Sequence, residues 1–215
     1  MRNLFNVPDE AVFQSQTNDN FELLKAWAGS TLAFAIFQAQ GNFLSQSFLI
    51  ILFISAVVCG LGFVLHELAH RIVARNYGAQ AHFVANNGML VLSIVVAFVG
   101  FFFAAPGAVW HRGYLTPRQG GLIALAGPAT NLALSVLFFI ALFFVNRFVP
   151  SLPANSLVRY GLMGLCSLGF KFNAFLGLFN MIPAGPFDGA KVLNWSPLVF
   201  GITVAIGLVL TFVIR

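Results

Sequence analysis

Long apolar segments separated by short polar breaks dominate the chain. They predict transmembrane helices, because a helix needs about 20 mainly apolar residues to cross a bilayer. The breaks are rich in glycine and proline, which are typical of turns. We therefore expect an all-α polytopic membrane protein with about five to six transmembrane helices. The apolar segments cover residues 22–40, 47–72, 89–109, 120–149, 157–181 and 197–214.

Residues 80–112 depart from this helical pattern. β-branched and aromatic residues flank Asn87-Gly88, a dipeptide typical of β-hairpin turns, and Pro106 with Gly107 interrupts the apolar run that follows. Three interpretations stay open for this region: membrane-embedded β structure, a helix, or a helix that runs into a strand. Irregular backbone and open sheet edges are tolerated at membrane depth only where they are buried in protein or line a water-filled cavity.

Composition supports a membrane protein, since 59% of the residues are hydrophobic and 8% are charged. Soluble domains have about 25% charged residues. We expect one membrane domain over residues 22–215 with a small membrane-embedded β element, after a polar N-terminal tail over residues 1–21. The net charge of +5 does not indicate nucleic-acid binding, because the basic residues are scattered. The lipid bilayer is the expected partner, and Cys59 and Cys166 are expected to be reduced packing residues.

The sequence HELAH at residues 66–70 is the first candidate for chemistry. His66 and His70 share one face of a helix, so both imidazoles can bind a zinc ion at about 2.0–2.1 Å. Glu67 is placed to take a proton from zinc-activated water, as in HExxH metallopeptidases. A carboxylate at the bilayer centre costs about 2.5–3.5 kcal/mol, which favours a functional role. In the alternative interpretation, Glu67 pairs with Arg71 and the histidines only make hydrogen bonds.

A catalytic zinc site usually has three protein ligands and one open position. After residue 22, Glu67 and Asp188 are the only carboxylates in the sequence. Asp188 stands in "IPAGPFDGA", where prolines exclude a regular helix and glycines permit unusual backbone angles. We therefore predict one zinc ion per chain, bound by Asp188 and the two histidines of HELAH. His82 and His111 are competing candidates, and a simple turn residue is the alternative interpretation of Asp188.

Together, "HELAH", "AGPATN" at 126–131 and "NMIPAGPFDG" at 180–189 resemble three ordered motifs of the site-2 protease family of intramembrane zinc metalloproteases. The resemblance implies that the three zinc ligands are His66, His70 and Asp188. It also implies that Glu67 is the general base and that Asn180 steadies the substrate carbonyl or the oxyanion. Asn131 matches the asparagine of the middle motif, whose role stays open. Phe187 stands where the family usually has leucine.

A shared zinc ion would restrict the topology. HELAH and Asp188 lie at the C-terminal ends of their helices, so these helices must run in the same direction. Residues 120–149 and 157–181 supply the two crossings between them, and we infer that residues 80–112 enter the membrane and return. The flanking Lys and Arg residues do not distinguish five spans from six. With five spans they place the site nearer the cytoplasmic side of the cell membrane.

These inferences predict cleavage of peptide bonds within the transmembrane segments of single-span membrane proteins. A strand edge within residues 80–112 would hold the substrate extended by β-augmentation, although a hairpin that only seals the cavity is an equal alternative. Lys171, inside an apolar segment, is either a cavity charge or an ammonium that reaches the interface. A non-catalytic metal-binding transporter or receptor is the main functional alternative.

Overall fold

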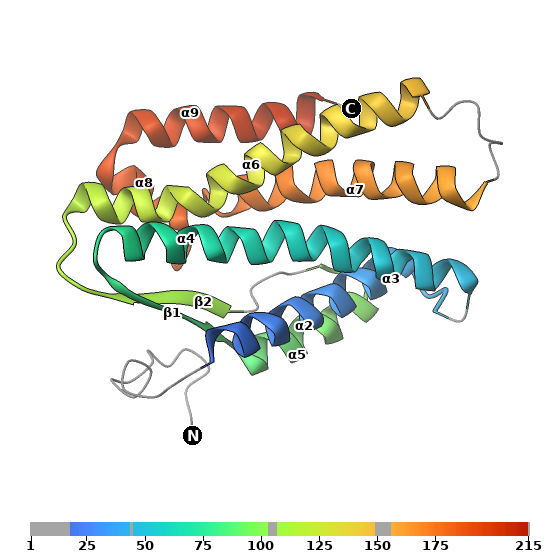
Figure 1. Cartoon of the computed structure of the whole chain (residues 1–215), viewed down its shortest axis with the longest axis horizontal. Helices are drawn as coiled ribbons and strands as arrows, with labels where there is room; N and C mark the ends of the chain where they lie inside the picture. The colour runs from blue at the N-terminus through green and yellow to red at the C-terminus, as the bar shows by residue number, and fades with distance from the viewer. Residues whose placement is uncertain (1–17, 44, 103–106, 149–155, 215) are drawn as a thin grey trace.

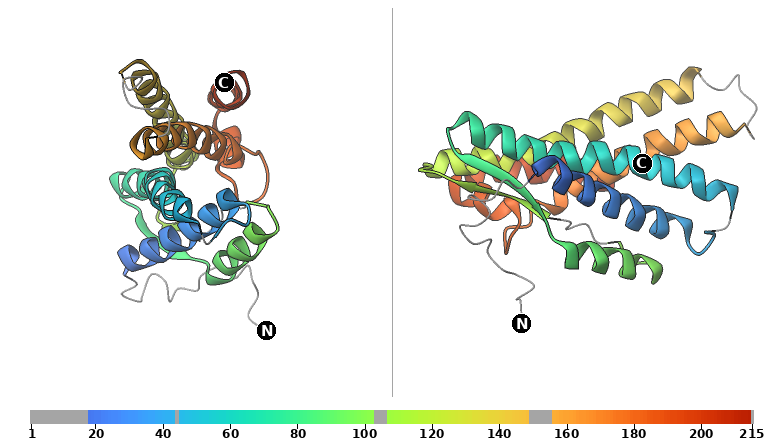
Figure 2. Two further views of the ribbon diagram at one scale, coloured as in Figure 1. Left: turned by 90° about the vertical axis from the view of Figure 1, so that its right-hand side faces the viewer. Right: turned by 60° about the horizontal axis from the view of Figure 1, so that its bottom comes forward.

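The computed structural model describes residues 18–43, 45–102, 107–148 and 156–214. A long helix made of α3, η1 and α4 lies between α6 and α7 on one side and α2 and α5 on the other (Figures 1 and 2). The elements in chain order are α2 (Asp19–Ala39), α3 (Gln46–Cys59), the π-helical turn η1 (Gly60–Val64), α4 (Leu65–Asn76), β1 (Gln80–Ala85), α5 (Asn87–Phe98), β2 (Gly107–Arg112), α6 (Pro117–Phe148), α7 (Leu157–Phe179), α8 (Asp188–Trp195), α9 (Pro197–Leu208) and the π-helical turn η2 (Val209–Val213).

The π-helical turn η1 directly precedes the HELAH motif. Two of its residues are glycines that pack against neighbouring helices. A Cβ atom on Gly60 would lie 2.6 Å from Nε1 of Trp27 in α2, and one on Gly62 would lie 2.7 Å from the ring of Phe172 in α7. The glycines therefore let the long helix approach both neighbours closely, just before its histidines. Single π turns inside α-helices occur frequently at functional sites.

Residues 80–112 form a strand, a helix and a second strand. β1 and β2 are antiparallel neighbours with Gln80 opposite Arg112, so the chain returns to the end of α4 from which it left (Figure 1). Of the interpretations left open, a β-hairpin turn at Asn87-Gly88 does not occur, because Asn87 begins α5. The side chain of Asn86 instead accepts a backbone hydrogen bond and caps the first turn of α5, a position that asparagine favours.

Helices α6 and α7 run antiparallel beside each other. The hydroxyl of Ser135 in α6 donates to the backbone carbonyl of Phe170 in α7 at 3.1 Å. Gly177 of α7 lies against the carbonyl oxygen of Pro128, where an added Cβ atom would be 3.2 Å away. This packing holds the middle of α6, which contains the AGPATN motif, between α7 and the HELAH turn of α4.

Three helical stretches in the described part of the chain are long and apolar enough to cross a membrane: Ser47–Asn76, Pro117–Phe148 and Leu157–Phe179. Large apolar side chains such as Phe143 and Leu137 are more than half exposed on them, as expected for a lipid-facing surface. The described part of the chain is therefore mainly helical with a two-stranded sheet, and its three long apolar helices are consistent with a membrane protein. The predicted count of five to six spans is not confirmed, because α5 and α9 with η2 are shorter apolar helices.

Three further predictions concern the tail, the cysteines and Lys171. Of the tail predicted over residues 1–21, only the last four residues are described, and α2 begins within it at Asp19. Cys59 and Cys166 are both free and buried. Lys171 is exposed and borders a groove lined mainly by phenylalanines of α2, α7 and the segment after α5.

Candidate metal centre

His66 and His70, in the first half of α4, and Asp188, the first residue of α8, converge on one point. The two Nε2 atoms of the histidines are 3.0 Å apart, and Oδ2 of Asp188 lies 3.4 Å from Nε2 of His66 and 3.1 Å from Nε2 of His70. Ligand atoms about 2.0–2.1 Å from a tetrahedral zinc ion lie roughly 3.4 Å from one another. Both histidines are buried. The three side chains therefore have the spacing of a three-ligand zinc site.

Hydrogen bonds at the far side of each imidazole determine which nitrogen carries the proton. Nδ1 of His66 lies 2.6 Å from Oδ1 of Asn131, and Nδ1 of His70 lies 2.7 Å from the carbonyl oxygen of Ile123. Both oxygens can only accept, so in a neutral imidazole each Nδ1 must donate. The two Nε2 atoms then have lone pairs and no proton, and they face each other without a hydrogen bond. A cation between them removes this conflict.

The orientation of the Asn131 amide is itself fixed. Its Nδ2 donates to the carbonyl oxygen of Gly62 at 2.7 Å and to Oδ1 of Asn173 at 3.0 Å. Both asparagines are fully buried. Because Nδ2 faces two acceptors, Oδ1 of Asn131 must face His66. This network gives the middle motif a structural role, and such partners of metal-binding histidines fix the tautomer and ring orientation.

Two glycines make room for the ligands. A Cβ atom on Gly127 of α6 would overlap the Nε2 atoms of both His66 and His70. A Cβ atom on Gly189 would overlap the backbone of Met181 at the end of α7. Gly189 thus lets the start of α8, with Asp188, pack directly on the turn that follows α7, while Gly127 leaves the metal-facing nitrogens uncovered.

Glu67 is buried in the same cavity as the ligands. Its carboxylate accepts a hydrogen bond from the backbone N–H of Val109 in β2. The alternative pairing of Glu67 with Arg71 is not observed, because Arg71 donates to Asp19 at 3.2 Å. Glu67 is therefore held by a neutral donor and remains directed to the cavity.

The cavity has a volume of about 100 Å³. Residues from five segments line it: His66, Glu67 and His70 of α4; Gly107, Ala108, Val109 and His111 of β2; Ile123 and Ala124 of α6; Asn180 and Pro186 of the segment after α7; and Asp188 and Lys191 of α8. The sequence-predicted Asn180 is thus at the cavity, where its Nδ2 donates to the carbonyl of Leu176 at 3.0 Å.

The competing histidines lie outside the ligand cluster. His82 contacts Asp19 at 2.9 Å, and His111 lines the cavity without joining the three converging side chains. Burial lowers the pKa of His111, and Lys191 and His70 lower it further. Burial opposes ionisation of Asp188, but His70 and the contacts with both imidazoles hold its pKa below the ordinary value.

The outer edge of β2 faces the cavity. In β1, the carbonyl of Ala81 and the N–H of Ala85 bond to side chains outside the sheet, so these alternate residues point away from β2. Hydrogen-bonding direction alternates along antiparallel strands, and the partners of Ala81 and Ala85 are His111 and Gly107. The backbone N–H and C=O groups of Gly107, Val109 and His111 therefore point toward the cavity.

Several of these residues carried no signal that we used in the sequence. Asn173 contacts Asn131, yet it was not singled out, and the packing role of Gly127 within the AGPATN motif was not anticipated. A polar side chain inside an apolar span is costly and commonly functional, which is the signal that would have found Asn173. Lys191 follows Asp188 by one helical turn and reaches the same cavity.

Comparison with known proteins supports the same chemistry. The chain is 42% identical over 175 residues to "Putative zinc metalloprotease MJ0611" of Methanocaldococcus jannaschii. The aligned region covers 80% of this chain and 84% of that protein. It is 31% identical to "Putative zinc metalloprotease YwhC" of Bacillus subtilis, over 62% of this chain and 64% of that protein. It is 32% identical to "Putative zinc metalloprotease Rip3" of Mycobacterium tuberculosis, over 65% of this chain and 30% of that protein.

No protein-family model and no solved structure matches the chain. The first of these relatives shares more than a third of its residues with this chain over most of both proteins, and the three motifs that carry the resemblance converge at one site. The chain therefore belongs to the family of these zinc metalloproteases, the site-2 protease family that its motifs resemble.

Proposed function

We propose that this protein is an intramembrane zinc metalloprotease that hydrolyses peptide bonds within transmembrane segments of single-span membrane proteins. The observation that carries the proposal is the convergence of two proton-free imidazole nitrogens and the carboxylate of Asp188 beside Glu67. These groups lie on and beside a helix that is apolar enough to cross a membrane.

The chemistry follows from the groups around the cavity. Zinc, when bound by His66, His70 and Asp188, supplies a Lewis acid that makes water nucleophilic near neutral pH. Glu67 takes the proton of the attacking water and delivers it to the leaving amine. An amide proton of Asn180 steadies the developing oxyanion, since a donor preorganised at that position stabilises the transition state.

The edge of β2 is the proposed binding site for the substrate backbone. A transmembrane helix hides its peptide bonds in its own hydrogen bonds, so the segment to be cut must first be extended. The outward N–H and C=O groups of Gly107 and His111 can pair with such a strand by β-augmentation. This pairing would place its backbone beside Glu67, which is within the same cavity.

The cell membrane is the proposed location, with the active site nearer the cytoplasmic side. Arg71, Arg75, Arg118 and Lys191 flank the end of the bundle that holds the site, and positively charged flanks favour the cytoplasm. At the opposite end lie Arg147 and Arg159.

The Glu67→Gln variant tests the proposed mechanism. It keeps the shape of the side chain and all three metal ligands, so we expect zinc binding to be unchanged. Cleavage of a reconstituted single-span substrate should fall by about 10²–10⁴-fold, the contribution typical of general acid–base catalysis. Wild-type protein treated with a zinc chelator is the control for loss of the metal, and it should lose cleavage as well. Near wild-type cleavage by Glu67→Gln, or zinc uptake into vesicles with no cleavage by the wild type, would contradict the proposal.

A further inference from the structure

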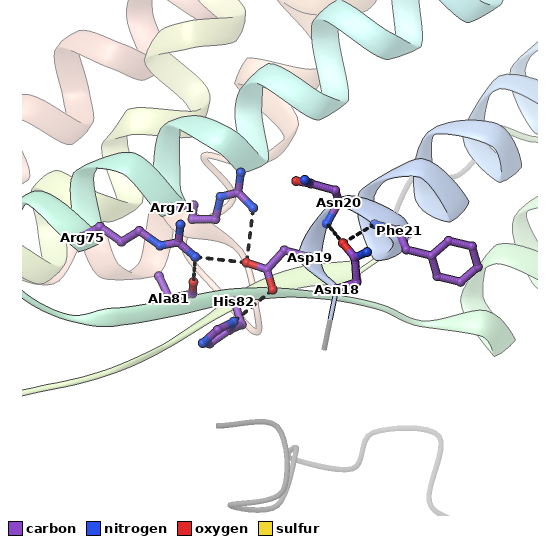
Figure 3. Close-up of polar contacts among 8 residues, drawn as sticks. All are labelled: Asn18, Asp19, Asn20, Phe21, Arg71, Arg75, Ala81 and His82. Atoms are coloured by element: carbon purple, nitrogen blue, oxygen red, sulfur yellow. Dashed lines mark hydrogen bonds and ion pairs between the residues drawn. The ribbon is translucent and has the colours of Figure 1, made fainter. Parts of the chain in front are cut away.

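A partly buried cluster of charges joins the beginning of α2 to α4 and β1 (Figure 3). Asp19, in the first turn of α2, accepts hydrogen bonds at Oδ2 from Arg71 at 3.2 Å and from Arg75 at 3.1 Å. Its Oδ1 lies 2.9 Å from Nδ1 of His82 in β1. The Asp19 side chain is only 11% exposed. We call Asp19 and these three partners the Asp19 clamp.

Two further contacts close the same edge of β1. Arg75 donates to the carbonyl oxygen of Ala81 at 2.7 Å. Glu22, one turn after Asp19 in α2, accepts the backbone N–H of Ala85 at 3.1 Å. The outer edge of β1 is therefore occupied near both of its ends, and α2 and α4 hold the strand in place. The edge of β2 is left as the one that faces the metal cavity.

The clamp contributes more to stability than an ordinary surface ion pair does. Exposed pairs contribute little, whereas a largely buried carboxylate with several charged donors forms strong hydrogen bonds. Removal of its negative charge would leave the guanidinium groups of Arg71 and Arg75 close together without their shared partner. Because Asp19 and Arg71 are mostly shielded from water, loss of the carboxylate charge destabilises the local arrangement.

The clamp is connected to the substrate-facing edge through β1 and β2. None of the side chains in the Asp19 clamp lines the metal cavity among the described residues. β1 pairs along its whole length with β2, and Val109 of β2 donates its backbone N–H to Glu67. The position of β1 therefore sets where the β2 edge lies relative to the metal ligands.

We propose that Asp19 is a positioning residue that holds the β2 edge at the distance from the metal centre required to bind an extended substrate. The inference rests on the proposed function, because it assumes that this edge takes up the substrate backbone. It predicts that loss of the clamp weakens binding of an extended peptide and leaves binding of the metal and of a small metal-binding group unchanged.

Two hydroxamates separate these effects in zinc-loaded, purified full-length protein. Acetohydroxamate contacts only the metal, whereas a hydroxamate attached to an apolar tetrapeptide also needs the strand edge. We expect Asp19→Asn to bind the peptidyl hydroxamate about tenfold more weakly than the wild type, which corresponds to a loss of about 1.4 kcal/mol in binding free energy. Its affinity for acetohydroxamate and its zinc content should match those of the wild type.

Asn20→Ala is the matched control, because Asn20 lies in the same turn with an exposed side chain outside the clamp (Figure 3). It should bind both hydroxamates like the wild type. If Asp19→Asn does not yield folded protein, Arg75→Gln gives the same comparison, since Arg75 is 49% exposed and bonds to both Asp19 and Ala81.

The outcomes are distinguishable. Equal affinity of Asp19→Asn and wild type for the peptidyl hydroxamate would overturn the positioning role, as would an equal loss of affinity for both hydroxamates. A zinc-loaded wild type that binds neither hydroxamate would contradict the proposed function itself, whatever the variants do.

Discussion

Each histidine of the HELAH motif has its Nδ1 proton held by one oxygen atom, and both oxygens belong to α6. The carbonyl of Ile123 is part of the backbone and tolerates most side-chain changes. The oxygen that faces His66 comes from the Asn131 side chain, which Gly62 and Asn173 hold in one orientation. The metal affinity of His66 therefore depends on a residue that does not touch the metal.

Asn131→Leu tests this dependence. Leucine has a similar size but no acceptor, so His66 loses the partner that keeps its proton on Nδ1. We expect zinc affinity to fall by about 10–100-fold, the loss typical for such partners, measured by competition with a chromophoric chelator. Ser135→Ala is the control, because Ser135 is buried one turn further along α6 and bonds to Phe170. Unchanged zinc affinity in Asn131→Leu would show that the Asn131 amide does not control the His66 tautomer.

The sequence was sufficient to predict which side chains converge at the cavity, but not their partners. His66, Glu67 and His70 follow from helical spacing, and Asp188 from the scarcity of carboxylates after residue 22. The alternative pairing of Arg71 with Glu67 does not occur, because Arg71 bonds to Asp19, although Glu67 is the acid nearest to it in sequence. The contact between Arg71 and Asp19 spans 52 residues of sequence, so no local sequence pattern indicates it.

Among the elements, α6 is the one whose surface is shaped to the metal centre. Its Gly127 lies against the Nε2 atoms of both histidines, so any side chain there would enter the space of the metal. Another glycine of the same helix, Gly120, has open space where a Cβ atom would be. The two positions thus differ in packing and not in helix geometry.

Gly127→Ala should abolish zinc binding, because the added methyl group would displace the imidazoles or push α6 away from α4. Gly120→Ala should retain full zinc content and be more stable by about 0.5–1 kcal/mol, the usual effect of replacing glycine within a helix. Metal analysis and thermal unfolding of the two purified variants give the comparison. A Gly127→Ala variant with wild-type zinc content would contradict the close contact of α6 with the ligands.

The element that sequence analysis described least well is the region over residues 80–112. The dipeptide Asn87-Gly88 favours a hairpin locally, but in the structure Asn86 caps a helix of 12 residues. The two strands then pair across that helix. Turn propensity is a weak local preference, and long-range pairing between β1 and β2 outweighs it here.

On the scale of the whole molecule, the direction of the helices decides whether the ligands can meet. β1 and β2 return the chain to the end of α4, and α6 and α7 then run away from that end and back (Figure 1). HELAH and Asp188 consequently share one end of the bundle. An additional crossing at residues 89–109 would have put them at opposite ends.

Labelling of single cysteines tests this topology in the membrane. Tyr77 and Tyr114 are exposed before β1 and after β2, and Arg147 is exposed at the other end of α6. We expect Tyr77→Cys and Tyr114→Cys to react with a membrane-impermeant maleimide from one face, and Arg147→Cys from the other. The native cysteines are buried. Reaction of Tyr77→Cys and Tyr114→Cys from opposite faces would show that the intervening segment crosses the membrane.

The zinc content of purified ligand variants measures most directly whether two histidines and a distant aspartate share one metal ion. The wild type should bind one zinc ion per chain, and His66→Ala, His70→Ala and Asp188→Ala should each lose it. His111→Ala should retain it, since His111 lines the cavity outside the ligand cluster. Wild-type zinc content and affinity in Asp188→Ala, or peptide-bond cleavage by fully metal-free wild type, would contradict a zinc protease built on these three side chains.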